Sequence, residues 1–173
     1  FTEKLPVLMF HYIQDIPSDT TDRLGYKLSF SPEKLEGLLV FLKKNNIETL
    51  TFWDLKDIIE NKRQFPEKAV MLTFDDGYLD HYQNAFPILK QYNMKAVFFI
   101  ITEKPDNDPV YATWEQLKEM AEDGQEIASH TVSHYDLITL SDEEIRFELE
   151  SSKKKIEKMT GNPVISLCYP FGK

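Results

Sequence analysis

The sequence has very little cysteine and no long hydrophobic run, and both absences narrow the class of protein. Cys168 is the only cysteine among 173 residues, so no disulfide can form within the chain. No apolar run approaches the roughly 20 residues that a membrane-spanning helix needs. Internal repeats, low-complexity tracts and linkers are also absent, so we expect one domain over residues 1–173.

Positive charge is scarce as well. The chain has 20 Lys and Arg residues against 29 Asp and Glu residues, for a formal net charge of -9 at pH 7. An acidic surface repels a phosphate backbone, which argues against nucleic acid as a partner. Hydrophobic residues make up 42% of the chain, enough for a core and too many for a disordered segment. Nothing in the composition predicts the oligomeric state.

Short apolar runs of strand length alternate with helical patterns. Most of these runs are almost wholly apolar, which is typical of parallel strands covered on both faces. The expected strands are Leu5–Phe10, Glu48–Phe52, Ala69–Phe74, Lys95–Ile101, Glu126–Ser129 and Val164–Tyr169.

Helix-start signals stand between these strands. Ser31, Thr113 and Ser141 have the side chains of N-cap residues, so we expect a helix to begin after each. Pro87 is expected to interrupt or kink the helix that follows Tyr78. The alternation of strands and helices predicts a parallel α/β fold.

The number of strands predicts a barrel that is not closed. We count six strands and no helix after the last, whereas a closed (β/α) barrel needs more. We therefore expect a distorted or incomplete barrel with its gap between Leu5–Phe10 and Val164–Tyr169, and a domain that continues beyond Lys173. The start at Phe1, with no signal-peptide pattern, suggests a trimmed chain from which any targeting segment is missing.

Two adjacent carboxylates follow the third expected strand. Asp75 and Asp76 stand at the end of an apolar run, where burial is costly unless they are paired or bind a cation. Neighbouring strand residues point to opposite sides, so one aspartate can face a metal while the other faces substrate or water. Gly77 permits a sharp exit from the strand. The alternative is a helix N-cap beside a solvated aspartate.

Two histidines follow the fifth expected strand. His130 and His134 are four positions apart, so their rings can meet if the segment is helical or tightly turned. Imidazole is a good ligand for zinc and related metals, although single histidines often only fill a core or a surface. The carboxyl ends of parallel strands share one edge, which would bring Asp75, Asp76 and both histidines together. Two histidines and one aspartate make a three-ligand site with open positions, as in catalytic metal sites.

These motifs resemble those of a known family. Thr73–Gly77 (TFDDG) and Ser129–His134 (SHTVSH) are similar to the first two motifs of carbohydrate esterase family 4, the NodB-homology polysaccharide deacetylases. Cys168–Phe171 (CYPF) is similar to the third motif, in which the family has Arg where this chain has Cys168. The resemblance spans Phe10 to Gly172 and implies removal of N-acetyl groups from a polysaccharide.

One subgroup of this family accounts for a further departure. The late Leu-x-His motif is absent after Phe171, but deacetylases of poly-β-1,6-N-acetyl-D-glucosamine carry that histidine near the N-terminus. Met9–His11 stands at the corresponding place, and the Tyr-Pro-Phe-Gly sequence at 169–172 also resembles that subgroup. The resemblance therefore favours this polymer as substrate. Chitin or peptidoglycan, or an inactive glycan-binding domain, remain the alternatives.

The resemblance also implies a role for each site residue. Asp76, His130 and His134 would hold a divalent metal, zinc in the first place, with cobalt or nickel as alternatives. Asp75 would be the general base and His11 the general acid, and the backbone N–H of Phe171 would stabilise the oxyanion. By the same resemblance, the protein would act outside the cell or at its surface.

Three other residues have weaker signals. Packing is the first expectation for both Tyr78, which follows Gly77, and Trp114, which follows a loop on the expected active face, although either ring could stack on a sugar as a substrate-binding residue. His81 lies early in a polar helical stretch and is interpreted as a solvated helix residue.

Overall fold

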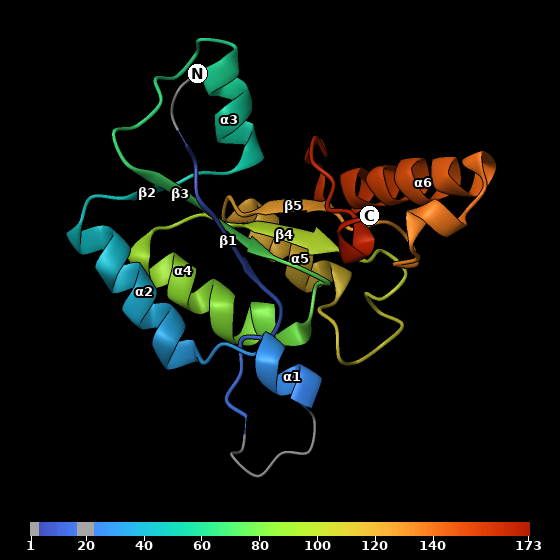
Figure 1. Ribbon diagram of the computed structural model, residues 1–173, viewed down its shortest axis with the longest axis horizontal. Helices are drawn as coiled ribbons and strands as arrows, with labels where there is room; N and C mark the ends of the chain where they lie inside the picture. Colours follow the sequence, from blue (N-terminus) through green and yellow to red (C-terminus); the bar gives the residue numbers. More distant parts are fainter. Residues whose placement is uncertain (1–3, 17–22) are drawn as a thin grey trace.

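The computed structural model describes residues 4–16 and 23–173, and its centre is a parallel sheet (Figure 1). The sheet has five strands, in the order β1-β3-β4-β5, with β2 paired to the start of β3. All of the described ladders are parallel. The strands are β1 (Val7–Phe10), β2 (Glu48–Thr49), β3 (Ala69–Phe74), β4 (Val97–Ile100) and β5 (Glu126–Ser129).

Helices connect the strands, as parallel pairing requires. In the middle of the chain α2 packs against α4, and further on α5 packs against α6 (Figure 1). The α-helices are α1 (Arg23–Leu28), α2 (Pro32–Lys44), α3 (Phe52–Ile59), α4 (Phe86–Tyr92), α5 (Trp114–Glu122) and α6 (Asp142–Thr160). A π-helix, η1 (His81–Ala85), and two 3₁₀ turns, η2 (Leu137–Thr139) and η3 (Pro170–Gly172), complete the described elements.

The expected N-caps are confirmed. The side chain of Ser31 accepts from the backbone N–H of Lys34, and Thr113 and Ser141 each form a full capping box. The core also follows the apolar pattern of the sequence. Phe74 of β3 and Phe98 of β4 are fully buried, with ring centroids 4.8 Å apart.

Pro87 changes the helix that precedes it. The helix takes the wider π geometry over His81–Ala85 and becomes an α-helix from Phe86. Proline has no N–H, and its ring clashes with the carbonyl of the residue four positions earlier in a regular α-helix. A π-bulge relieves that clash without ending the helix, so the expected interruption is a local widening.

Two of the expected strands differ from the prediction. Residues 164–169 form no strand, and only Leu167 makes a parallel bridge, to Ser129 of β5. Prolines at 163 and 170 flank this segment, and proline cannot donate to a ladder. β2 stops at Thr49 rather than Phe52, because Thr51 is the N-cap of α3.

The described ladders do not connect the two segments between which the sequence predicts a gap. β1 lies at one edge, and the segment 164–169 lies beyond β5 at the other. Within residues 4–16 and 23–173, no ladder joins these two segments. The helices of the same residues include none with both the length and the apolar content that crossing a bilayer requires.

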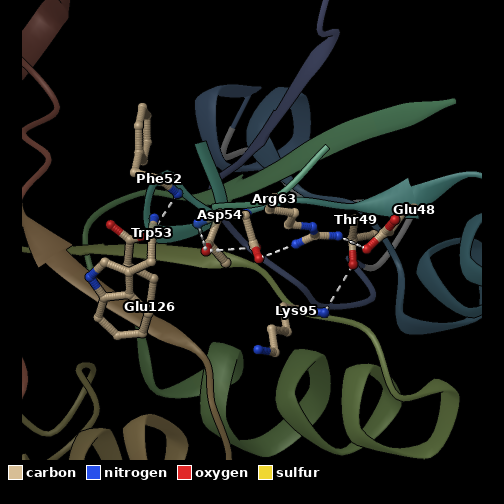
Figure 2. A network of polar contacts seen from close by, with 9 residues as sticks. Glu48, Thr49, Phe52, Trp53, Asp54, Arg63, Lys95 and Glu126 are labelled. Atoms are coloured by element: carbon tan, nitrogen blue, oxygen red, sulfur yellow. Dashed lines mark hydrogen bonds and ion pairs between the residues drawn. The ribbon is translucent and has the colours of Figure 1, made fainter. Parts of the chain in front are cut away.

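Polar contacts join the first residues of β2 and β5 to the start of α3 (Figure 2). The buried carboxylate of Glu126, the first residue of β5, accepts from the backbone N–H of Phe52 at 2.7 Å and of Trp53 at 3.2 Å. Arg63 pairs with Asp54 of α3 and with Glu48 of β2. Side chains therefore stabilise the end of the sheet at which the strands begin, opposite the end at which β3 and β5 finish.

Candidate active site

Asp75 and Asp76 leave the C-terminal end of β3 together. The N–H of Asp75 donates to the carbonyl of Phe10 at 2.9 Å, which continues the β1–β3 ladder. Asp76 turns the chain, with a φ of 76°. Gly77 follows with a φ of 84°, and a Cβ there would lie 2.9 Å from the side chain of Ile100. The sharp exit therefore requires glycine at 77 for both conformation and space.

His130 and His134 are brought together by a tight turn rather than a helix. The turn contains two positive φ angles, 70° at Thr131 and 59° at His134. The hydroxyl of Thr131 accepts from the N–H of His134 at 3.1 Å. The two imidazole rings consequently lie with centroids 4.6 Å apart.

Glu148 of α6 holds this turn, and the sequence pattern alone did not single it out. Its buried carboxylate accepts from the N–H of Val132 at 2.8 Å and of Ser133 at 2.9 Å. The available signal was one acidic residue on the inner side of an amphipathic helix. That signal is weak, because most acidic residues on helices are solvated.

Three potential ligand atoms converge where the two loops meet. The Nε2 atoms of His130 and His134 are 3.1 Å apart, and Oδ1 of Asp76 lies 3.4 Å and 3.5 Å from them. Atoms that bind one zinc-sized ion at about 2.1 Å with tetrahedral angles lie about 3.4 Å from one another. The three distances therefore fit three corners of a tetrahedral metal site, with the fourth left for water or substrate.

The hydrogen bond at the far side of His130 supports this arrangement. Nδ1 of His130 lies 2.9 Å from the carbonyl oxygen of Cys168, so we assign Nδ1 as the donor. In the neutral ring, Nε2 then directs a lone pair toward His134 and Asp76. The Nε2 atoms of the two rings are 3.1 Å apart, so either a proton or a metal ion between them would offset the repulsion of their lone pairs.

The pKa values of His130 and His134 shift in opposite directions. Burial lowers the pKa of His130, but the Asp76 carboxylate and Cys168 outweigh it and raise the value to about 10. Burial and the neighbouring His130 lower the pKa of His134. The two rings and Asp76 together thus favour one positive charge, which is the electrostatic requirement of a cation site.

The pKa values of the two aspartates shift in opposite directions. Burial raises the pKa of Asp75, and the nearby His130 and His11 offset this only in part. Burial would also raise the pKa of Asp76, but hydrogen bonding and charge from His130 and His134 lower it below its usual value. Such opposite shifts within one site are typical of an acid–base group beside a permanently ionised ligand.

Cys168 contacts both Asp75 and His130. Its thiol lies 3.6 Å from Oδ2 of Asp75, within the range of a weak sulfur hydrogen bond, while its carbonyl accepts from His130. The other oxygen of Asp75 is buried and has no partner among the described residues. The thiol thus contacts the carboxylate that, by family resemblance, an arginine would orient.

His11 follows the end of β1 and lies beside the cluster. Phe10 pairs with Phe74, so His11 and Asp75 are the first residues beyond two adjacent strand ends. The backbone carbonyl of Phe10, directly before His11, accepts from the N–H of Asp75 at 2.9 Å, so the two residues leave their strands side by side. The structure therefore brings together Asp75, Asp76, His11, His130 and His134 at one edge.

The remaining residues expected at the site differ in exposure. Phe171 is exposed, has a φ of 58°, and its ring lies 4.8 Å from that of His134. Tyr78 stacks with Tyr12 at 4.2 Å and with Tyr111 at 5.0 Å, so its faces are engaged within the protein. The expectation that the Tyr78 ring stacks on a sugar is therefore replaced by packing.

Two further interpretations are wrong. Trp114 is only 4% exposed and packs in the core on α5, so its ring offers no face to a sugar. His81 is 1% exposed rather than solvated, because its ring packs against Phe74 and Phe98. Polar neighbours in the sequence concealed the burial of His81, whereas packing was already the first expectation for Trp114.

Fold and site together define a parallel α/β protein with an aspartate–histidine cluster of metal-ligand geometry at the C-terminal edge of its sheet. The family model described as polysaccharide deacetylase matches residues 62–173. The chain belongs to the polysaccharide deacetylase family.

Similar proteins extend the match to nearly the whole chain. YxkH of Bacillus subtilis (strain 168), whose name assigns it to the same family, is 36% identical over 98% of this chain. The poly-beta-1,6-N-acetyl-D-glucosamine N-deacetylase of Staphylococcus aureus (strain MRSA252) is 30% identical over 83% of it. The chain spans 57% and 54% of the lengths of these two relatives.

A solved structure gives the same fold. The deacetylase PplD of Streptococcus pyogenes, in complex with acetate, superposes with a TM-score of 0.90 at 31% identity. The match covers 99% of this chain and 75% of that one. The parallel α/β fold described above is therefore the fold of a known deacetylase.

Proposed function

We propose that the protein is a metal-dependent N-deacetylase that hydrolyses acetamido groups on a polysaccharide. The convergence of Asp76, His130 and His134 on one point carries this proposal, because three ligand atoms 3.1–3.5 Å apart leave an open position for a reacting group. Family membership supports the same activity.

The three converging side chains are the proposed metal ligands. The donor set of one carboxylate and two imidazoles suits zinc, which we take as the metal, and cobalt or nickel would accept the same set. When bound, such an ion would polarise the acetyl carbonyl and make a water molecule more acidic. Asp76, with its lowered pKa, stays ionised and so contributes negative charge to the ligand set.

Asp75 is the proposed general base. Its raised pKa makes it a better proton acceptor than an ordinary carboxylate, and one of its oxygens is buried without a partner among the described residues. That oxygen takes the proton from water as the water oxygen bonds to the acetyl carbon. The backbone N–H of Phe171 is the proposed donor to the resulting oxyanion.

His11 is the proposed general acid. The amide nitrogen leaves poorly as an anion, so a proton must reach it as the carbon–nitrogen bond breaks. Of the four histidines, His130 and His134 are assigned to the metal and His81 is buried in an aromatic pocket. The products are acetate and a free-amine sugar residue.

The proposed substrate is poly-β-1,6-N-acetyl-D-glucosamine, and the proposed location is outside the cell or at its surface. The support is the relative from Staphylococcus aureus that bears this activity in its name, and the place of His11 after β1. An acidic chain is compatible with a substrate that gains free amines as it is deacetylated.

The test compares matched substrates on one enzyme preparation. Acetate release is measured from β-1,6- and β-1,4-linked N-acetylglucosamine oligomers of equal length and from peptidoglycan fragments, with Asp75→Asn as the inactive control. We expect faster release from the β-1,6 series and a loss on the order of a hundredfold or more in the variant. Faster release from the β-1,4 series would overturn the substrate, and no release above the control from any glycan would overturn the activity.

A further inference from the structure

The short segment that carries His11 is held by side chains of the helix that follows the Asp75–Gly77 turn. His81 bonds through Nε2 to the backbone carbonyl of His11 itself. Asp80 accepts from the N–H of Ile13 at 2.9 Å, and Asn84 donates to the carbonyl of Ile13 at 2.7 Å. All of these contacts reach backbone atoms, so they fix the path of the chain rather than the identity of its side chains.

The three side chains that hold this segment lie within the π-helix or directly before it. Asp80 precedes η1, while His81 and Asn84 lie within it. Pro87 follows this π turn, and π-bulges of this kind are frequent at functional sites.

His81 is buried in a setting that keeps it a neutral donor. Its ring contacts the rings of Phe74, Tyr78 and Phe98, and burial lowers its pKa to about 4. A neutral imidazole carries one N–H, and the carbonyl of His11 assigns that hydrogen to Nε2. Nδ1 has no partner among the described residues, so the contact with His11 is its one described hydrogen bond to the backbone.

We propose that His81 is a positioning residue for His11: its Nε2–H holds the backbone of His11, and so sets where the imidazole of His11 lies relative to Asp75 and the metal ligands. This inference rests on the proposed function. His81 does not touch substrate, and it acts only through His11. A displacement of about 1 Å at a reacting group can lower turnover on the order of a hundredfold.

The test uses two replacements of His81 in the complete chain. His81→Phe keeps the ring volume and removes the donor, whereas His81→Gln places an amide N–H near the former Nε2. We expect His81→Phe to lower kcat about tenfold or more with KM and metal content unchanged, because a general acid acts in the transition state. His81→Gln should recover part of the loss.

A double variant separates positioning from a general structural effect. If His81 acts through His11, then adding His81→Phe to His11→Ala lowers kcat no further. Equal fold losses in both backgrounds would overturn the inference, since independent effects multiply. If the wild-type chain releases no acetate at all, both the proposed function and this inference fail, whereas an active wild type with multiplying losses overturns the inference alone.

Asn84 provides a second route if His81→Phe does not fold. Asn84 is only half-buried and holds the same segment through Ile13, so Asn84→Ala should fold and lower kcat through a misplaced His11. The matched control is Gln83→Ala, an exposed neighbour on the same π-helix. Equal kcat for Asn84→Ala and Gln83→Ala would overturn the inference, and a loss confined to Asn84→Ala that vanishes in the His11→Ala background supports it.

Discussion

At the scale of single residues, two aspartates of the site differ in pKa because their surroundings differ. Asp75 and Asp76 are neighbours in the chain, yet the pKa of one is raised by burial and that of the other is lowered by two imidazoles. The difference arises because Asp76 turns out of the strand with a positive φ while Asp75 stays in the direction of β3. Two roles thus follow from one short motif.

The thiol of Cys168 is predicted to support Asp75. Cys168→Ala removes the only described donor to Oδ2 of Asp75, at a cost of about 0.5–1.5 kcal/mol for one weak hydrogen bond. We therefore expect a two- to tenfold lower kcat with unchanged metal content, and near-normal kcat for Cys168→Ser, which keeps a donor. Steady-state kinetics and metal analysis check this, and wild-type kcat in Cys168→Ala would contradict it.

His81 is predicted to make the protein less stable in acid. Its ordinary pKa of 6.5 falls to about 4 in the folded protein, so below pH 6.5 the unfolded state binds a proton that the folded state does not. The free energy of unfolding attributable to His81 is therefore lost as pH falls from 6.5 to 4, by up to about 3 kcal/mol. Above pH 6.5 the group has no effect.

Urea denaturation of the wild type and His81→Phe at pH 7.5 and pH 4.5 measures this. Asp80, whose pKa burial raises to about 6, acts in the opposite sense, and its Oδ1 lies 3.7 Å from Nε2 of His81, so the same pair is also compared in an Asp80→Asn background. The wild type should lose stability relative to the variant at the lower pH. A difference independent of pH would show that His81 titrates normally.

The grouping of the proposed ligands was predictable from sequence, but the burial of His81 was not. Asp76 and His130 lie within two residues of strand ends and His134 lies in the turn after β5, and the fold class alone brings such positions to one end of the sheet. His81 was misjudged because its contacts come from residues distant in the chain, such as Phe98. Periodicity over a short window carries no information on such neighbours.

At the scale of secondary-structure elements, α6 acts as the support of the histidine turn. Its Glu148 binds two backbone N–H groups of the turn, and its Ser152 hydroxyl lies 2.7 Å from that of Ser129 at the end of β5. The capping box at Ser141 was readable from the sequence, while the inward direction of Glu148 required the packed helix. The start of α6 was therefore predictable from the sequence, whereas its support of the histidine turn was not.

Removal of this support is predicted to weaken metal binding. Glu148→Ala leaves the N–H groups of Val132 and Ser133 without their acceptor, so the turn that holds His134 loosens. Loss of such an outer contact typically costs ten- to a hundredfold in metal affinity. Competition with a chromogenic chelator measures the affinity. Glu150→Ala, exposed on the same helix, is the control, and equal affinities in the two variants would contradict the prediction.

At the scale of the whole molecule, the two ends of the parallel strands carry different groups of residues. The C-terminal edge gathers the titratable groups of the site, and the N-terminal edge is braced by Glu126, Arg63 and their partners (Figure 2). This division is common where loops after parallel strands carry chemistry and loops before them carry stability. The parallel direction of the strands was predictable from the alternation of strands and helices. The contacts of Glu126 were not predictable, because they join residues more than 70 positions apart.

Glu126 is predicted to matter for stability. Glu126→Ala leaves the N–H groups of Phe52 and Trp53 and the hydroxyl of Ser166 without their acceptor. The expected loss is about 2–4 kcal/mol in the free energy of unfolding, less than the sum of three lost partners because water can reach some of them. Urea denaturation measures it, with exposed Glu122→Ala as control. Equal stability of the two variants would show that the brace contributes nothing.

The central claim is that Asp76, His130 and His134 hold a metal on which deacetylation depends. Its most direct test is acetate release from a β-1,6-linked N-acetylglucosamine oligomer by the wild type and by His134→Ala, before chelation, after chelation and after zinc is restored. We predict that the wild type holds about one metal ion per chain, loses activity on chelation and regains it with zinc. His134→Ala should have low activity in all three states. Full activity of the metal-free wild type, or of His134→Ala, would contradict the account.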